Sequence, residues 1–464
     1  MFQKYKNYNN IRTGESRDNA KRIILLVEGR KCITIYNMFT LGARLPLHLF
    51  GITASYTNNK MEDKGQEYLS KDILDEDFIN TFNMVYNFQK FMASSRIYVK
   101  DRFVTAPTIL QKCHTMFNVV LILALNIYII EKYVFSLSGN KAVYYLSTCA
   151  IGLQSITFFC NVIHVRFFNG EANANFYIKL QLIDRCMKIE HNISINKISY
   201  TIYLLTIGIV LAMFCPLLVM AATKYDFGTF LSFAGSTYTQ SCFVLELLCC
   251  SNIIIHFFIR TSFINAIIEN HIKQTKLKPI SSKDKLPISI CSTKMFMRQL
   301  ANETHNFYWS ETDVYLREIF DGFSKFRNIY QFQVCVFCCK LVLSCLISFE
   351  FLIYGLQNNT MSMLESLTPA IFTAIDLLIA VILGVRSEVF FREVKETKRL
   401  AIKVLSLHHE GRLRDTAKKM LKMIEETPPR FSVYEMWQLN ANILLSMFAL
   451  VTSLVLTQLQ FAFL

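Results

Sequence analysis

Apolar residues along the chain gather into seven blocks in which few charges occur. The blocks cover residues 113–137, 142–165, 199–222, 229–259, 330–356, 367–386 and 441–461. A helix rises about 1.5 Å per residue, so about 20 residues are enough to cross roughly 30 Å of hydrocarbon. The pattern predicts an all-α polytopic membrane protein with seven transmembrane helices.

An eighth apolar block, residues 32–56, is weaker because Arg44, Pro46 and His48 interrupt it. A charge at the centre of a bilayer costs at least about 2.5 kcal/mol. We therefore expect a re-entrant or interfacial segment ahead of the first span. The residues before this block contain no apolar core with a small-residue cleavage site, so insertion is expected to depend on internal helices.

The charge distribution predicts the orientation. A net charge of +14 would suggest nucleic acid as the partner of a soluble protein, but the basic residues here lie between the apolar blocks and form no single patch. Segments 1–112, 166–198, 260–329 and 386–440 contain 17, 5, 11 and 12 Lys and Arg residues, whereas the loops between them contain only Lys141 and Lys224. Basic loops stay in the cytoplasm, which places the N-terminus inside and the C-terminus outside. The sequon at Asn358 falls in a predicted outside loop and agrees.

The same pattern divides the chain into six regions. They are a cytoplasmic N-terminal region (1–112), transmembrane helices one to four (113–259), a cytoplasmic loop with a helical anchor (260–329), helices five and six (330–386), a cytoplasmic anchor helix (387–440) and the last helix (441–464). Residues 302–327 and 391–426 have apolar residues at helical spacing. We expect the first of these helices to continue into the fifth span and the second to end at Pro428-Pro429, both packing below the membrane, with a position on the membrane surface as the alternative.

Residue patterns for catalysis or metal binding are absent from the sequence. It contains no Gly-rich phosphate loop, no HExxH and no GxSxG, so we expect neither an enzyme nor a cofactor. None of the 14 cysteines lies in a predicted outside loop, and we expect no structural disulfide. The adjacent pairs Cys249-Cys250 and Cys338-Cys339 point to different helix faces, which argues against a metal site. His408-His409 is interpreted as a solvated surface pair.

The last helix carries a stripe of small and polar residues. Asn442, Ser446, Ala449, Ser453, Thr457 and Gln460 follow one another at steps of three or four, while Leu444, Phe448, Val451 and Val455 occupy the opposite face. Polar residues inside a span need a partner or water. The stripe is consistent with helix packing through hydroxyl groups and equally with the wall of a pore.

Other polar residues inside the spans mark a candidate ligand pocket. Carboxylates occur in spans four, five and six, and aromatic residues crowd the predicted outer halves of the helices. An outward-opening cavity could hydrate the carboxylates, and pairing with Lys340 or with buried hydroxyls is the alternative. The candidate ligand-binding residues are Tyr145, Gln154, Phe233, Tyr238, Gln240, Glu246, Glu350, Tyr354, Phe372 and Asp376.

The end of the chain resembles that of the insect gustatory receptors, relatives of the insect odorant receptors. In that family a Phe-Ser segment leads into the last helix, which closes with Thr-Tyr, five apolar residues and Gln-Phe. Here Phe431-Ser432 precedes the last helix, and Ser453-Leu454, VLTQL and Gln460-Phe461 close it, with Leu454 in the place of the Tyr. The segment MFTLGARLP (38–46) resembles the Leu-Gly-x-x-Pro segment before the first span, and YWSETDVYLREIF (308–320) is similar to the helix before the fifth.

This resemblance implies a tetrameric, ligand-gated, non-selective cation channel in the plasma membrane, with the last helix lining the pore and the ligand bound in the outer half of spans two to six. It implies that Ser453, Thr457 and Gln460 line the pore and that Phe461 or Leu464 forms a hydrophobic gate near the outside surface. The partners would be a small tastant, monovalent and divalent cations, membrane lipid and other receptor subunits, in a homotetramer or heterotetramer. The setting would be the dendrite of a taste neuron.

Two other classes remain open. A metabotropic seven-helix chemoreceptor would need an extracellular N-terminus. A secondary transporter would suit the intramembrane carboxylates, but the chain shows no evident inverted repeat and no pair of Gly/Pro-broken helices at matched positions. Sugars, bitter alkaloids and dietary lipids all remain candidate tastants.

Overall fold

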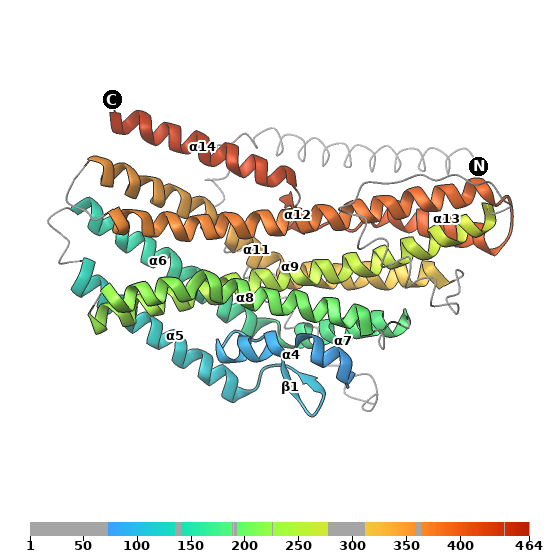
Figure 1. Cartoon of the computed structure of the whole chain (residues 1–464), viewed down its shortest axis with the longest axis horizontal. Coiled ribbons are helices and arrows are strands. Elements are labelled where there is room, and N and C mark those ends of the chain that lie inside the picture. Colours follow the sequence, from blue (N-terminus) through green and yellow to red (C-terminus); the bar gives the residue numbers. More distant parts are fainter. Residues whose placement is uncertain are drawn as a thin grey trace, which may run out of the picture. The chain divides into compact units, whose positions relative to one another are not determined.

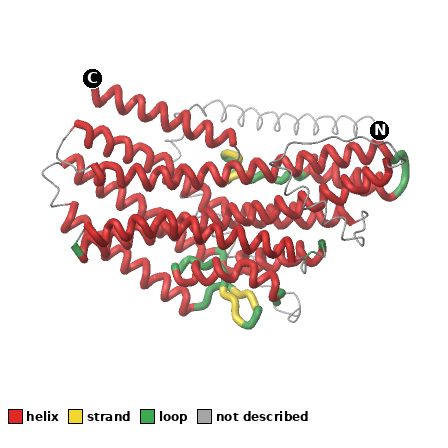
Figure 2. Tube along the Cα trace, viewed as in Figure 1, coloured by secondary structure: helices red, strands yellow, loops and turns green. Residues whose placement is uncertain are grey.

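The computed structural model describes residues 73–134, 141–187, 189, 193–224, 226–276, 311–357, 363–439 and 441–463. The eighth apolar block (32–56), residues 302–310 of the predicted cytoplasmic helix, the sequon residues 358–360 and Leu464 lie outside the described residues. Helices dominate the described part of the chain (Figure 2).

The elements follow in chain order. They are α4 (Glu76–Phe91), strands β1 (Tyr98–Lys100) and β2 (Phe103–Thr105), α5 (Ile109–Ile129), the π-helical turn η1 (Ile130–Val134), α6 (Lys141–Ile163), the π-helical turn η2 (His164–Phe168), α7 (Gly170–Cys186), α8 (Ile193–Lys224), α9 (Phe227–Lys276), α11 (Thr312–Gln357), α12 (Met363–Leu407), α13 (Arg412–Glu426), strands β3 (Ser432–Val433) and β4 (Trp437–Gln438), and α14 (Ala441–Phe463). Both strand pairs are short antiparallel hairpins, β1 with β2 and β3 with β4.

The protein is an all-α polytopic membrane protein, as predicted. A helix covers each of the seven apolar blocks, and those in α5, α6, α8, α9, α11 and α12 are long and apolar enough to cross a membrane. The apolar part of α14 spans Leu445–Gln460. The first of these helices begins at Ile109, four residues before the predicted span, because Thr108 and Gln111 form a capping box that fixes its start.

Helix α9 lies at the centre of the bundle, between α12, α8, α5, α11 and α6 (Figure 1). The most apolar part of this helix is 89% buried, compared with 22% to 39% for the other five spans. Polar side chains that lipid cannot satisfy, among them Gln240, Glu246, Asn252 and Arg260, are buried along α9. These side chains favour a position in which other helices surround it.

Three helices are about twice as long as a span requires: α9 has 50 residues, α11 has 46 and α12 has 45. Their extensions pack around buried aromatic rings of Phe257, Phe323, Phe326, Phe390 and Phe431. The fifth span thus continues the cytoplasmic helix that precedes it, as predicted for the described residues from Thr312 onward.

The prediction of one helix over residues 391–426 was wrong. Helix α12 runs without a break from the sixth span to Leu407, and α13 starts at Arg412. Gly411 separates them with φ +99°, a conformation that side-chain-bearing residues rarely adopt. Apolar spacing cannot reveal such a reversal, because both helices bury the same kind of stripe.

Helices α4 and α7 and the β1–β2 hairpin were not predicted. Helix α7 occupies most of the short loop 166–198, and α4 lies in the N-terminal region. Arg185 of α7 donates to the Asp75 carboxylate at 2.6 and 2.9 Å, and the backbone N–H of Asp75 donates to Gln181 at 2.8 Å. These contacts fix the start of α4 on α7.

Candidate functional site

The polar stripe of α14 is exposed in the single chain. Ser446, Ala449, Ser453, Thr457 and Gln460 are all exposed, and the Asn442 and Phe461 side chains, like Leu464, lie outside the described residues. The opposite face packs on α11 and α12, where Val455 is buried and Met447 and Val451 contact the core. The stripe therefore points away from the described residues of its own chain.

An exposed polar stripe on a membrane helix needs a partner other than lipid. Hydrocarbon offers no hydrogen bonds, so polar groups in spans face other helices or water. Thr457 satisfies its own proton by donating to the carbonyl of Ser453 at 2.9 Å, and Thr452 does the same with Phe448 at 2.8 Å. These local bonds lower the cost of exposure, and they leave the hydroxyl lone pairs free to accept bonds from water or from another subunit.

A second polar feature, the Lys340 triad, joins α9, α11 and α12 inside the bundle. It consists of Gln240, Lys340 and Asp376, all at least 96% buried. The Lys340 ammonium lies 2.7 and 3.0 Å from the two Asp376 oxygens and donates to the Gln240 amide oxygen at 2.6 Å. The Gln240 amide nitrogen donates to Asp376 at 2.8 Å, which closes the ring of bonds.

Hydroxyl groups between α11 and α12 lie next to the Lys340 triad, toward the predicted outside, and together with the triad they form a polar seam. The hydroxyls of Ser348 and Thr373 lie 2.6 Å apart, and Thr373 also lies 3.3 Å from the Ser344 carbonyl. Every member of the seam has a partner, so it is stable as built. A ligand with its own donors and acceptors could replace some of these hydrogen bonds with bonds to itself. An apolar molecule that entered the seam would instead leave Lys340 or Asp376 buried without a partner.

Glu246 belongs to a separate cluster. It pairs with Arg96, which also donates to Asn173 at 3.2 Å and stacks its guanidinium 3.9 Å over the Tyr330 ring. Burial alone would lower the pKa of Arg96, but the Glu246 carboxylate more than offsets this and the pKa is raised. Glu246 lies about five turns, or roughly 28 Å, from the start of α9. The structure thus places it away from the outer half of the helices, where the sequence interpretation had put it.

The other predicted ligand residues are dispersed. Gln154 donates to the Ser236 carbonyl at 2.6 Å, and the Tyr238 hydroxyl donates to the Met92 carbonyl at 2.7 Å, toward the N-terminal segment. Tyr145 is 63% exposed and contacts the Tyr144 ring. The remaining four are half-buried: Phe233, Glu350, Tyr354 and Phe372. Of the ten, only Gln240 and Asp376 are in direct contact through the bonds described above.

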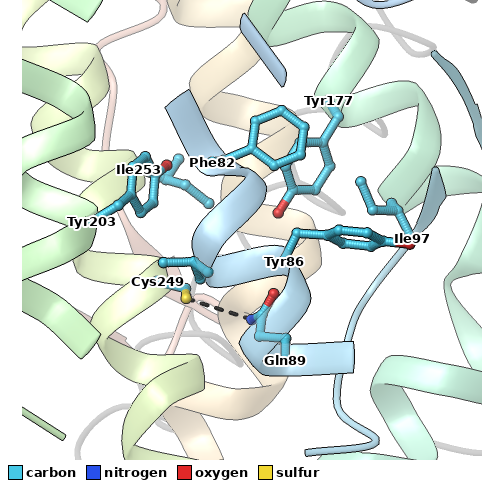
Figure 3. A pocket seen from close by; sticks show the side chains of 9 residues that line it. Phe82, Tyr86, Gln89, Ile97, Tyr177, Tyr203, Cys249 and Ile253 are labelled. Atoms are coloured by element: carbon cyan, nitrogen blue, oxygen red, sulfur yellow. Dashed lines mark hydrogen bonds between the residues drawn. The ribbon is translucent and has the colours of Figure 1, made fainter. Parts of the chain in front are cut away.

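Cavities in the described residues lie elsewhere. One, beside Glu246, is lined by side chains of α4, α7, α8 and α9 and by Ile97, and Gln89 spans it to reach Cys249 at 3.4 Å (Figure 3). Three tyrosines, Tyr86, Tyr177 and Tyr203, face it. It has room for about one water molecule, so it suits structural hydration rather than a tastant.

Sequence reasoning missed the polar partners of Glu246 that the N-terminal region supplies. Arg96 and Gln89 lie in segments with no evident apolar block, so nothing in the local pattern indicated that they enter the bundle. Among the described residues, no group of three or more His, Cys, Asp or Glu side chains is placed to hold a metal ion. His408 is half-buried and its ring lies 5.9 Å from that of His271, whereas His409 is exposed.

Similarity to known proteins is found in structure and not in sequence. No protein-family model and no curated protein match the sequence. Among solved structures, the chain is similar to the insect olfactory receptor OR5 from Machilis hrabei in complex with eugenol, with 11% sequence identity, coverage of 83% of this chain and 100% of that chain, and a TM-score of 0.44. This level of similarity does not assign the chain to a family.

Proposed function

We propose that the protein is a gustatory receptor: a ligand-gated, non-selective cation channel of the plasma membrane that a small tastant opens. The observation that carries the proposal is the exposed polar stripe of α14, directly opposite the face that packs on α11 and α12. Several subunits arranged with these stripes inward enclose a polar path through the membrane. The resemblance of the closing segment to the gustatory receptors favours four subunits, identical or mixed.

In this proposal Ser453 and Thr457 line the path, and Gln460 forms a polar ring close to its outer end. Phe461 and Leu464 follow at the end of the helix and form a hydrophobic gate, which dewets when closed. Monovalent and divalent cations pass when the gate widens. The setting is the dendritic membrane of a taste neuron.

The ligand is proposed to bind in the outer half of the bundle, above the Lys340 triad. The candidate contacts are Tyr145, Gln154, Phe233, Tyr238, Gln240, Glu350, Tyr354, Phe372 and Asp376. Two of the three helices joined by the triad, α11 and α12, also contact α14. A ligand that shifts α11 against α12 therefore moves two helices that contact the proposed pore helix directly. Hydroxyl-rich or amine-bearing molecules fit the polar seam best.

The test is ion permeation through Gln460→Glu. A carboxylate in place of the amide adds a negative charge for each subunit at the narrow end of the pore, so permeability for calcium relative to sodium should rise. Phe448→Gln, on the side of α14 opposite the polar stripe, is the matched control and should leave the ratio unchanged. Unchanged permeability ratios in Gln460→Glu would count strongly against a pore at this stripe. Calcium imaging of cells that express the chain alone, across a tastant panel, would identify the ligand.

A transporter is the second candidate, because the buried Lys340 and Asp376 resemble the intramembrane charges that carriers use. A carrier turns over one substrate per conformational cycle. Single-channel recordings separate the two: discrete openings favour the channel, and their absence despite tastant-driven uptake favours the transporter.

A further inference from the structure

Arg166 is a buried guanidinium that has no counter-charge among the described residues. It lies in η2 and is 1% exposed. Its Nε donates to the Ala93 carbonyl at 3.2 Å, whereas Nη1 and Nη2 have no hydrogen-bond partner among the described residues. A guanidinium stays protonated in proteins, so this charge requires acceptors.

Other buried basic residues of the described chain are paired with carboxylates. Arg96 pairs with Glu246, and Lys340 pairs with Asp376. Arg260 donates from Nε and Nη2 to the two carboxylate oxygens of Asp184, each at 2.8 Å. Removing one partner from such pairs is strongly destabilising, because an uncompensated charge is left inside. Arg96 also has one unmatched nitrogen, Nη2, but Glu246 balances its charge, whereas Arg166 has no carboxylate partner among the described residues, so an external anion would complete it.

A second unmatched donor lies beside Arg166. The Thr115 hydroxyl donates to the same Ala93 carbonyl at 3.0 Å, and Gln111 precedes Thr115 by one helical turn on α5. The Gln111 amide nitrogen is buried and has no partner among the described residues. All three unmatched atoms of these two side chains are donors, so the missing ligand is rich in acceptors, as a phosphate is.

The start of α5 and the η2 turn are in close contact, which makes this neighbourhood one site. The Lys112 ammonium lies 5.8 Å from the Phe167 ring. A Cβ placed on Gly170, at the start of α7, would lie 3.0 Å from Ala106 and 3.2 Å from Pro107, so only glycine allows this approach. Lys112 is half-buried and adds a further positive charge.

The site lies at a membrane boundary. Arg166 directly follows the predicted second span (142–165), on the predicted cytoplasmic side. Large apolar side chains around it are exposed: Ile109, Leu110, Phe117, Phe167 and Phe168. Exposed apolar side chains at this depth contact acyl chains, so the phosphate groups of the inner leaflet lie at the level of Arg166.

We propose that Arg166, together with Gln111 and Lys112, binds the phosphate group of an anionic lipid headgroup between α5 and η2. The guanidinium and the amide donate to the phosphate oxygens, and the acyl chains lie along the exposed apolar residues. This lipid site requires only that the chain spans a membrane and does not depend on channel activity.

The test uses the full chain in nanodiscs of phosphatidylcholine with and without phosphatidylinositol 4-phosphate, with lipids that stay bound counted by native mass spectrometry. The wild type should retain the phosphoinositide in preference to phosphatidylcholine, and Arg166→Gln should lower this retention by about tenfold or more, since bidentate charged bonds are lost. Arg102→Gln is the matched control: it removes one basic residue from the same predicted face, where Arg102 is exposed and paired with Glu76 at 2.6 Å.

If Arg166→Gln does not fold, Gln111→Leu tests the same site with Arg166 still present. It should lower the retention of the phosphoinositide. A second arm adds inorganic phosphate to phosphatidylcholine nanodiscs and follows the thermal unfolding midpoint. Stabilisation by inorganic phosphate that Gln111→Leu abolishes would show a free anion as the ligand and overturn the lipid assignment. Equal phosphoinositide retention by the wild type and both variants would overturn the site itself.

Discussion

Single residues in this bundle are stabilised through partners far away in the sequence. Lys340 and Asp376 lie on neighbouring helices and share Gln240, which comes from the central helix. In a low-dielectric interior such a network is favourable only when every member is satisfied. The triad thus fixes the positions of α9, α11 and α12 along one another. Apolar packing alone would tolerate more than one such alignment.

The Lys340 triad yields a prediction at this scale. Lys340→Met leaves Asp376 buried without its counter-charge and should destabilise the protein by about 3 kcal/mol or more. The double variant Lys340→Met/Asp376→Leu removes both charges and should recover most of the loss. Thermal unfolding midpoints of the purified protein in detergent check both, with Arg399→Met as the control, because Arg399 forms an exposed pair with Glu396 that contributes little. A single variant as stable as the wild type would contradict the role of the pair.

Sequence reasoning at the residue scale identified which side chains need partners, but not which partners they find. Pairing with Lys340 or with buried hydroxyls is the alternative that the sequence offers for the three carboxylates, but the sequence does not indicate that Lys340 pairs with Asp376. The pairing of Glu246 with Arg96 could not be predicted, because the two are 150 residues apart and Arg96 lies in a segment without helical periodicity. The cost of burying a charge is visible in a sequence, whereas the contact that relieves it is a property of the fold.

At the scale of elements, apolar periodicity located the helices well and their interruptions poorly. All seven apolar blocks are helical, since a block of that length has no other stable form in a bilayer. Helix α7 was missed because its buried residues include Asn173, Gln181 and Asp184, which a hydropathy pattern scores as surface. Polar groups buried against other polar groups are invisible to such a pattern.

The reversal between α12 and α13 depends on Gly411. Its φ of +99° and ψ of 175° place it in a region that only glycine occupies readily, so Gly411→Ala should cost about 1–3 kcal/mol. Helix α13 buries Ala417 and Met420 against its neighbours, and strain at its first turn should loosen that contact. Hydrogen exchange should therefore accelerate over residues 412–426. Gly208→Ala, in an open position within α8, is the control and should be neutral or slightly stabilising.

The face of α14 that lines the proposed pore is testable without a ligand. The background lacks the exposed cysteines of the described residues (Cys113, Cys149, Cys215 and Cys339) and also Cys32 and Cys291, all replaced by serine. In it, Ser453→Cys and Thr457→Cys should react with a charged thiol reagent on the order of tenfold faster than Phe448→Cys. Thiolates form in water and not in hydrocarbon, so the rates report which face is wet. Faster reaction at Phe448→Cys would show that the stripe packs against protein and does not line a pore.

At the scale of the whole molecule, the charged extensions all lie at one end of the bundle. Helices α9 and α12 run toward that end and α11 runs from it, and the packed rings of Phe257, Phe323 and Phe390, one from each helix, join the three into one body. The short segment 166–198 also lies at this end and contains five Lys and Arg residues, and short basic loops stay in the cytoplasm. The loops at the other end contain only Lys141 and Lys224, which fits an outer surface.

This architecture predicts an N-terminus inside the cell and a C-terminus outside, the reverse of a metabotropic seven-helix receptor. An odd number of spans places the two ends on opposite sides, and the basic body fixes which side is which. An epitope tag after Leu464 should be labelled on intact cells, and a tag before Met1 should be labelled only after permeabilisation. A tag in the loop 358–362 is the positive control and one in 277–310 the negative control. Labelling of the N-terminal tag on intact cells would exclude the inward-facing body, and with it a gate at Phe461 near the outer surface.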